Sequence, residues 1–185
     1  MAYFPMMVEL ADRRVLVVGG GEEGTKKIKI LHEFGCLITL IAKEASTDAA
    51  RFSDVFLNRD FKDSDISNEY AFIVAATENE DLNKRIFILA KEKKIPVNVV
   101  DNVRLCTFIF PAIVKEEDVV VSVSSGGKSP YIAQHIKSLI QDVLPKGVGK
   151  INNYMGGLRE QARRDIPDRM ERRRFLRLKL EEALK

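Results

Sequence analysis

Cysteine, histidine and long apolar runs are scarce in this chain of 185 residues. Cys36 and Cys106 are its only cysteines, and no CxxC pair or Cys/His cluster occurs, which argues against a disulfide framework or a structural zinc site. His32 and His135 are far apart in the sequence, so ordinary surface or core positions explain them better than metal binding. This cysteine usage is typical of a reducing compartment, and we expect a cytoplasmic protein.

Apolar segments are short throughout. None approaches the roughly 18 residues that a membrane-spanning helix requires. The first ten residues, MAYFPMMVEL, lack the basic start and apolar core of a secretory signal. We therefore expect no membrane as a partner. Hydrophobic residues still make up 45% of the chain, enough for one complete core and a smaller appended unit.

Positive charge is concentrated near the C-terminus. Residues 146–185 hold 12 of the 30 Lys and Arg residues but 6 of the 27 Asp and Glu residues. Two interpretations stay open: a site for a polyanion such as a tetrapyrrole or a nucleic acid, or a solvated helical face. The interspersed acidic residues favour the solvated face, so nucleic acid is not an expected partner.

The most informative segment is VLVVGGGEEG, residues 15–24, in which a short apolar run leads through a glycine turn into a helical pattern. Gly19 permits the tight turn, Gly21 lets the backbone approach a pyrophosphate, and Gly24 allows close helix–strand packing. The N-terminus of the helix favours a phosphate. This context predicts a dinucleotide site, whereas the alternative is a glycine turn without a ligand. The expected cofactor-binding residues of this segment are Gly19, Gly20, Gly21, Glu22, Glu23 and Gly24.

Strand and helix patterns alternate up to residue 100. We predict strands at residues 15–18, 37–41, 55–61, 71–76 and 97–100, and helices at residues 23–34, 48–52 and 79–93. This alternation implies an α/β fold, a Rossmann-type parallel sheet covered on both faces. Ligands bind at the carboxyl ends of such strands. We therefore expect residues 19–24, 42–44 and 76–77 to converge with Asp101 on one crevice.

The pattern changes after residue 107. Strands are predicted at residues 108–114 and 118–124, and a helix at residues 131–144 follows the SSGGKSP loop. Ser129 as N-cap and Pro130 at the first helical position favour the start of that helix. Residues 147–157 are predicted to be a hinge or loop, and the remainder one or two charged helices split near Pro167.

Seven segments together resemble the precorrin-2 dehydrogenases, the siroheme-synthase enzymes that oxidise precorrin-2 to sirohydrochlorin with NAD. They occur in the family's order and cover roughly residues 3–145: YFPMMVEL, VLVVGGGEEGTKK, ITLIAKE, IVAATENEDLN, VNVVDN, FIFPAIV and VSSGGKSPYIA. The resemblance implies the stand-alone form of the enzyme and a homodimer. It also implies an NAD-binding Rossmann domain at residues 1–113, an appended α+β dimerisation and substrate element at 114–146, and a C-terminal helical tail at 147–185.

The resemblance also implies the chemistry of the site. Asp101 matches the aspartate that the family is thought to use, and we expect it to act as general acid/base; the alternative is that it only ends a strand. Some members also insert ferrous iron into sirohydrochlorin. Here the iron would be a substrate, with Asp101 as a transient ligand, and we expect no dedicated metal site.

Cofactor choice depends on the end of the second strand. In Rossmann folds an acidic residue about 20 positions after the glycines binds the adenosine ribose, and Glu44 comes one or two residues later than that position. Lys43 leaves NADP open as the cofactor, because a cation could accommodate its 2′-phosphate. We expect NAD, because the family has a similar non-acidic strand end. Thr77 and Asn79 are expected to border the nicotinamide, with ordinary turn chemistry as the alternative.

The SSGGKSP loop is the predicted substrate site. Its glycines and the following helix N-terminus favour an anion, and the family's substrate carries carboxylates; the alternative is a simple helix cap. The expected substrate-binding residues are Arg104, Ser125, Gly126, Gly127 and Lys128. Two rival functions stay open. One is another NAD-linked dehydrogenase, and the other is a non-catalytic NAD-sensing regulatory domain that needs neither Asp101 nor this loop.

Overall fold

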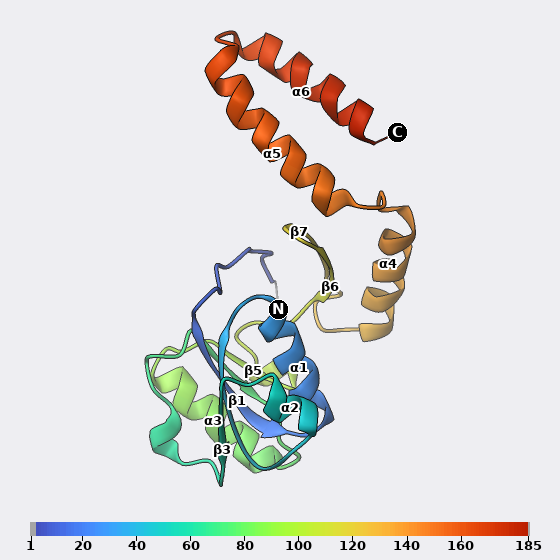
Figure 1. Ribbon diagram of the computed structural model, residues 1–185. Helices are drawn as coiled ribbons and strands as arrows, with labels where there is room; N and C mark the ends of the chain where they lie inside the picture. The colour runs from blue at the N-terminus through green and yellow to red at the C-terminus, as the bar shows by residue number, and fades with distance from the viewer. Residues whose placement is uncertain (1–2, 185) are drawn as a thin grey trace. The chain divides into compact units, whose positions relative to one another are not determined.

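The computed structural model describes residues 3–184, and the chain divides into two compact units at residues 110 and 111 (Figure 1). The expected boundary between residues 113 and 114 falls inside a strand of the second unit, β6 (Ala112–Glu116). The three-part division of the chain stays a prediction. None of the helices in residues 3–184 has the length and apolar character that crossing a membrane requires.

The first unit contains the predicted parallel sheet, with the strand order β3-β2-β1-β4-β5. Its strands are β1 (Arg14–Gly20), β2 (Leu37–Ala45), β3 (Val55–Asn58), β4 (Phe72–Ala75) and β5 (Val97–Val99). The order reverses between β1 and β4, and ligands bind at such a reversal in doubly wound folds. The Rossmann-type prediction is therefore confirmed.

Helices cover both faces of this sheet, as Figure 1 shows for α1 (Glu22–Glu33), α2 (Thr47–Arg51) and α3 (Glu80–Glu92). Along β1, Val15 and Val17 belong to the core under α1 and α2, whereas Leu16 and Val18 belong to the core under α3. This alternation follows from the two-residue period of a strand. Each of these side chains is at most 2% exposed, and full burial of such a side chain stabilises the fold by about 1.5–3 kcal/mol.

The second unit contains a hairpin and a helical segment. The strand β6 pairs antiparallel with β7 (Val119–Val123), and α4 (Pro130–Val143) packs against both. Ser129 caps α4 as predicted, because its hydroxyl accepts a hydrogen bond from Ile132 N at 3.3 Å. The helices α5 (Val148–Asp165) and α6 (Arg169–Ala183) follow, and the predicted split near Pro167 is confirmed.

Two predicted strands are shorter than expected. The strand β3 ends at Asn58, three residues early, and β6 begins only at Ala112, so residues 108–111 are not part of a strand. The apolar character of that segment has another cause. The rings of Phe108 and Phe110 pack edge-on against Phe72, with ring centroids 5.0 and 6.4 Å from it. These aromatic residues belong to the core of the first unit, so the segment is apolar because it is buried there and not because it forms a strand.

The predicted loop at residues 147–157 is wrong, because α5 runs through it. Gly147 precedes the helix with a φ of 74°, which glycine adopts readily. Gly149 lies inside the helix for a packing reason. A Cβ atom there would lie 2.8 Å from Glu116 O, and Gly149 N donates to the Glu116 carboxylate at 3.2 Å. The glycine therefore lets α5 approach the β6–β7 turn.

The two kinds of glycine in α5 predict opposite effects of the same substitution. Gly149→Ala forces a methyl group against Glu116, and we expect it to lower the free energy of unfolding by about 1–3 kcal/mol. Gly156 has no atom within 4 Å of an added Cβ, so Gly156→Ala should raise that free energy by about 0.5–1 kcal/mol through helix propensity. Urea unfolding followed by circular dichroism measures both, and equal effects would contradict the packing argument.

Candidate dinucleotide site

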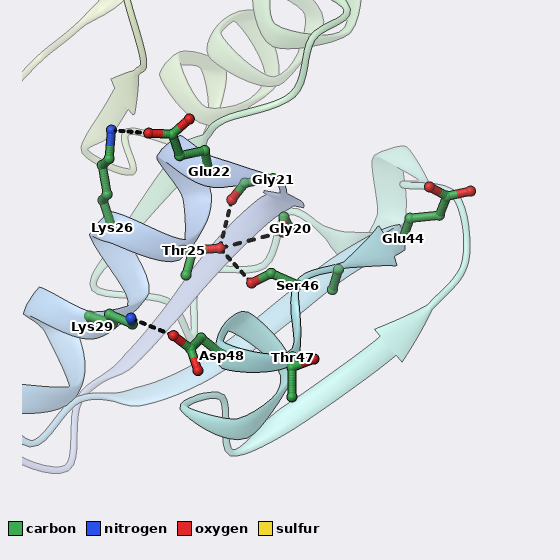
Figure 2. A pocket seen from close by; sticks show the side chains of 11 residues that line it. Gly20, Gly21, Glu22, Thr25, Lys26, Lys29, Glu44, Ser46, Thr47 and Asp48 are labelled. Carbon is green, nitrogen blue, oxygen red and sulfur yellow. Dashed lines mark hydrogen bonds and ion pairs between the residues drawn. The ribbon is translucent and has the colours of Figure 1, made fainter.

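A cavity of about 770 Å³ lies where the glycine turn after β1 faces the end of β2 and the start of α2 (Figure 2). Its lining comes from α1 and the preceding turn on one side and from the β2–α2 segment on the other. The lining residues are Gly20, Gly21, Glu22, Thr25, Lys26, Lys29, Glu44, Ala45, Ser46, Thr47 and Asp48. This part of the predicted crevice therefore forms from segments about 20 residues apart, the spacing of a nucleotide-binding βαβ unit.

The start of α1 is open to a ligand. Gly21 is the N-cap residue and no side chain caps the helix there. An added Cβ at Gly21 would meet nothing within 4 Å. The first-turn N–H groups of a helix need partners from outside the helix, and the dipole favours an anionic one. A pyrophosphate group therefore fits the uncapped start of α1 beside the cavity.

The glycine turn also contacts β4. Gly19 has a φ of 108°, and an added Cβ would lie 2.2 Å from Ala76 O and 2.9 Å from Thr77 N. A Cβ at Gly24 would lie 2.1 Å from Gly19 O. All three distances are below a normal contact, so only glycine lets β1, α1 and the end of β4 come this close. Residues 19–24 and 76–77 thus meet as expected at the point where the strand order reverses.

Two hydroxyl groups join the walls of the cavity. Thr25 Oγ1 donates to Gly21 O at 2.7 Å and lies 2.8 Å from Ser46 Oγ. Ser46 in turn caps α2 by accepting from Ala49 N at 3.0 Å. Figure 2 shows Thr25 between the glycine turn and Ser46. The width of the cavity is therefore fixed by a hydrogen-bonded contact between α1 and the β2–α2 segment.

The charges of the cavity lie mostly in ion pairs. Lys26 Nζ is 2.7 Å from a carboxylate oxygen of Glu22 and 2.7 Å from one of Glu23, and Lys29 pairs with Asp48 at 2.5 Å. The hydrogen bond from Lys26 lowers the pKa of Glu22, and the hydrogen bond from Lys29 lowers the pKa of Asp48. These carboxylates therefore stay ionised at neutral pH.

The two residues predicted at the end of β2 differ in their surroundings. Glu44 lines the cavity, and its carboxylate has no hydrogen-bond or ion-pair partner among residues 3–184. Lys43 does not line the cavity; its ammonium pairs with Asp60 at 3.1 Å. The lining as a whole therefore contains three carboxylates and two ammonium groups, and so carries a net negative charge.

Thr77 and Asn79 are held by turn contacts. Thr77 Oγ1 donates to Asn83 Oδ1 at 2.7 Å, and Asn79 caps α3 by accepting from Leu82 N at 3.0 Å. Asn83 is 7% exposed and also donates to Thr77 O at 2.8 Å. The sequence did not point to Asn83, whose side chain fixes the turn beside Gly19. Contact of Thr77 or Asn79 with a nicotinamide stays a prediction.

Asp101 lies in the turn after β5, with a φ of 60° that is uncommon for a residue other than glycine. Its side chain is exposed and has no hydrogen-bond or ion-pair partner among residues 3–184. Arg104 follows on the short 3₁₀ helix η2 (Val103–Leu105) and is also exposed. Both residues therefore lie on one loop at the carboxyl end of an edge strand, free to meet a ligand.

The SSGGKSP loop belongs to the second unit. Ser125 Oγ accepts from Ser129 N at 3.0 Å, and Lys128 N donates to Ser125 O at 3.3 Å. Gly126 and Gly127 have φ values of 65° and 77°. The capping alternative thus accounts for the serine contacts, while the exposed Lys128 side chain remains available to an anion.

Sequence reasoning missed the part of the cavity that follows β2. Ser46, Thr47 and Asp48 line that part, and Thr25 of α1, on the facing side, was missed as well. A signal was present, because Ser46 precedes a short helical pattern as an N-cap residue would. No set of three or more His, Cys, Asp or Glu residues within residues 3–184 is arranged to hold a metal ion.

The glycine contacts predict that ligand binding and folding respond to different substitutions. Gly24→Ala places a methyl group against Gly19 O and should lower the free energy of unfolding by about 1–3 kcal/mol. Gly21→Ala meets open space, so stability should change by less than about 0.5 kcal/mol while dinucleotide affinity falls about tenfold or more. Thermal unfolding and NAD titration of both variants measure this, and unchanged NAD affinity in Gly21→Ala would remove the pyrophosphate assignment.

Known proteins resemble this chain in sequence and in fold. Proteins named siroheme synthase align with 95% of the chain, at 34% identity in Vesicomyosocius okutanii and 36% in Thioalkalivibrio sulfidiphilus. The chain spans 38% and 36% of the length of these two relatives. A solved structure, "SirC, precorrin-2 dehydrogenase", has the same fold with a TM-score of 0.76 at 24% identity, covering 94% of this chain and 87% of that one.

A family model described as "Putative NAD(P)-binding" matches residues 6–112. That range includes the parallel sheet, the glycine turn and every residue that lines the cavity. The family match indicates a nicotinamide dinucleotide as the ligand, and the uncapped start of α1 beside the cavity fits its pyrophosphate. The chain belongs to this NAD(P)-binding family.

Proposed function

We propose that this chain oxidises precorrin-2 to sirohydrochlorin with NAD, as a step of siroheme biosynthesis. One observation carries the proposal: an uncapped helix start and glycine turn, built for a dinucleotide, belong to a chain that aligns over 95% of its length with siroheme synthases. Insertion of ferrous iron into the product, as a substrate and not as a resident metal, is part of the same proposal. The rival classes are an NAD sensor and a different dehydrogenase.

The residues of the cavity fit the cofactor. The backbone at Gly20 and Gly21 and the first turn of α1 would hold the pyrophosphate, and Glu44 would accept hydrogen bonds from the adenosine ribose. When bound, NAD accepts a hydride from the substrate. Asp101 has an exposed carboxylate at the carboxyl end of the sheet, so it would accept the proton that leaves the substrate. Arg104 on the same loop would bind a substrate carboxylate, and the exposed Lys128 of the SSGGKSP loop is likewise assigned to a substrate carboxylate.

A homodimer is part of the proposal. Along α4 four apolar side chains are exposed at the spacing of a helix-packing seam: Ile132, Ile136, Leu139 and Val143. Exposed apolar patches of this kind mark interaction sites. We assign this face, together with the hairpin, to the contact with a second copy, and the mass of the protein in solution tests the assignment.

We base the proposed preference for NAD on the charge of the cavity. NADP carries an additional phosphate on the adenosine ribose, next to the end of β2. Glu44 is unpaired there, and Lys43 is drawn toward Asp60, so an added phosphate would meet a carboxylate and no free ammonium group. The wall therefore disfavours NADP more than NAD.

Removing the charge of Glu44 should weaken this preference. We expect Glu44→Gln to lower the ratio of NAD to NADP affinity by about threefold to tenfold, equivalent to about 0.7–1.4 kcal/mol. Glu33→Gln is the matched control, because Glu33 is exposed at the other end of α1 and does not line the cavity. Titration of both nucleotides measures the ratio. A strong preference of the parent chain for NADP would overturn the assignment.

Asp101→Asn separates the enzyme from the sensor. Asparagine tolerates a positive φ, so the loop should keep its conformation while the base is lost. We expect turnover to fall by about 10²–10⁴-fold with NAD affinity unchanged, whereas a sensor would be indifferent. Asp12→Asn is the matched control, because Asp12 also has a positive φ, 59°, but lies before β1, at the amino end of that strand and not at a carboxyl end.

The decisive assay uses the full chain with precorrin-2 and NAD under anaerobic conditions, followed optically. Formation of NADH and sirohydrochlorin is the expected result, and the absence of both products would contradict the proposal. Ferrous iron added afterwards tests the second activity. Iron insertion no faster than the spontaneous rate would leave the chain as a dehydrogenase only.

A further inference from the structure

The loop that carries Asp101 and Arg104 leaves the sheet after β5 and returns to the same strand. Asn102 N donates to Val99 O at 3.3 Å, and Leu105 N donates to Asn102 O at 3.0 Å. Thr107 N then donates to Val97 O at 2.8 Å. Backbone hydrogen bonds with β5 therefore hold the two ends of the loop together.

Two side chains complete that closure. β5 is the last strand of the sheet, so one side of its backbone has no neighbouring strand. On this side Val97 N donates to Thr107 Oγ1 at 2.8 Å, and Val99 N donates to Cys106 Sγ at 3.2 Å. A hydroxyl and a thiol thus accept the hydrogen bonds that a sixth strand would otherwise accept.

The thiol of Cys106 also reaches the loop itself. Its sulfur lies 3.2 Å from Val99 O and 3.3 Å from Asn102 O, the residue directly after Asp101. Cys106 is 9% exposed, and burial raises the pKa of its thiol, so it stays protonated and able to donate. A single buried side chain therefore joins the end of β5 to the carbonyl group of Asn102, the residue after Asp101.

Asp101 needs such support. Its φ of 60° is unfavourable for a residue with a Cβ, and such conformations persist only where the surroundings fix them. The Asp101 side chain contributes nothing to this, because it has no partner among residues 3–184. The restraint must come from the backbone on either side, which is where Cys106 makes its contacts.

We propose that Cys106, supported by Thr107, is a positioning residue that holds the Asp101 loop in its reactive conformation. This inference rests on the proposed function, in which Asp101 moves the proton. Cys106 itself touches neither cofactor nor substrate in this assignment. Its role is to fix where the Asp101 carboxylate stands relative to the end of the sheet.

The experiment compares three variants of the full chain. Cys106→Ala removes the hydrogen bonds, Cys106→Ser keeps a donor and an acceptor, and Cys36→Ala is the matched control. Cys36 is also a buried free cysteine of the first unit, but it belongs to the core on the opposite face of the sheet. Turnover of precorrin-2, NAD affinity and amide hydrogen exchange at residues 99–105 are measured for each variant.

We expect Cys106→Ala to lower kcat by about 10- to 100-fold, because a small displacement of a catalytic group has effects of this size. NAD affinity should stay within about twofold, since the cavity does not include this loop, and exchange at residues 99–105 should accelerate. Cys106→Ser should restore most of kcat and of the protection. Cys36→Ala should change neither. Should Cys106→Ala fail to fold, Thr107→Val removes the neighbouring hydroxyl with little change of shape and is read in the same way.

Three outcomes overturn the inference. One is a kcat of Cys106→Ala equal to that of Cys36→Ala, and another is unchanged exchange at residues 99–105. A parallel loss of NAD affinity and kcat would likewise assign Cys106 to general stability. Failure of the proposed function looks different, because the parent chain would then not oxidise precorrin-2 while the exchange data would still decide whether Cys106 restrains the loop.

Discussion

The close approach of three backbone segments at Gly19 is the constraint on which the rest of the first unit depends. Gly19, Gly24 and Ala76 bring β1, α1 and the end of β4 to distances that no Cβ would permit. Because α1 can then start directly against the sheet, its uncapped N-terminus lies beside the cavity. The same contact places the Thr77–Asn83 turn beside the glycines, so the dinucleotide site and the reversal of strand order are two results of one packing arrangement.

The residues proposed for the cofactor and those proposed for the substrate lie on elements that differ in burial. The glycine turn lies on the buried central strand, whose side chains are at most 2% exposed from Val15 to Val18. Asp101 lies instead on an exposed loop of an edge strand, and the SSGGKSP loop belongs to the second unit. The proposed assignment, with the cofactor on a buried element and the substrate on loops, matches the usual placement of binding residues on loops held by a rigid scaffold.

Sequence patterns predicted the sheet well because its strands are buried. The run from Val15 to Val18 and the run in β4 contain no polar residue. Because these strands alternate with helices along the chain, the pattern indicates a parallel sheet. Errors arose where a contact links distant residues. Phe108 and Phe110 resembled a strand because they pack on Phe72, and Gly149 resembled a loop because it packs on Glu116. The hydroxyls of Thr25 and Ser46 carry no periodic signal, so their place in the cavity required the structure.

The contacts of Cys106 and Thr107 have a consequence beyond the site. Exposed strand edges invite strands of other molecules to add to a sheet, which is a common route to aggregation. At β5 the outward N–H groups of Val97 and Val99 are already satisfied, so this edge offers no template to another chain. The opposite edge strand, β3, has only four residues, from Val55 to Asn58. One edge of the sheet is therefore covered by two side chains and the other edge strand is short. Both features oppose the addition of strands from other molecules at high protein concentration.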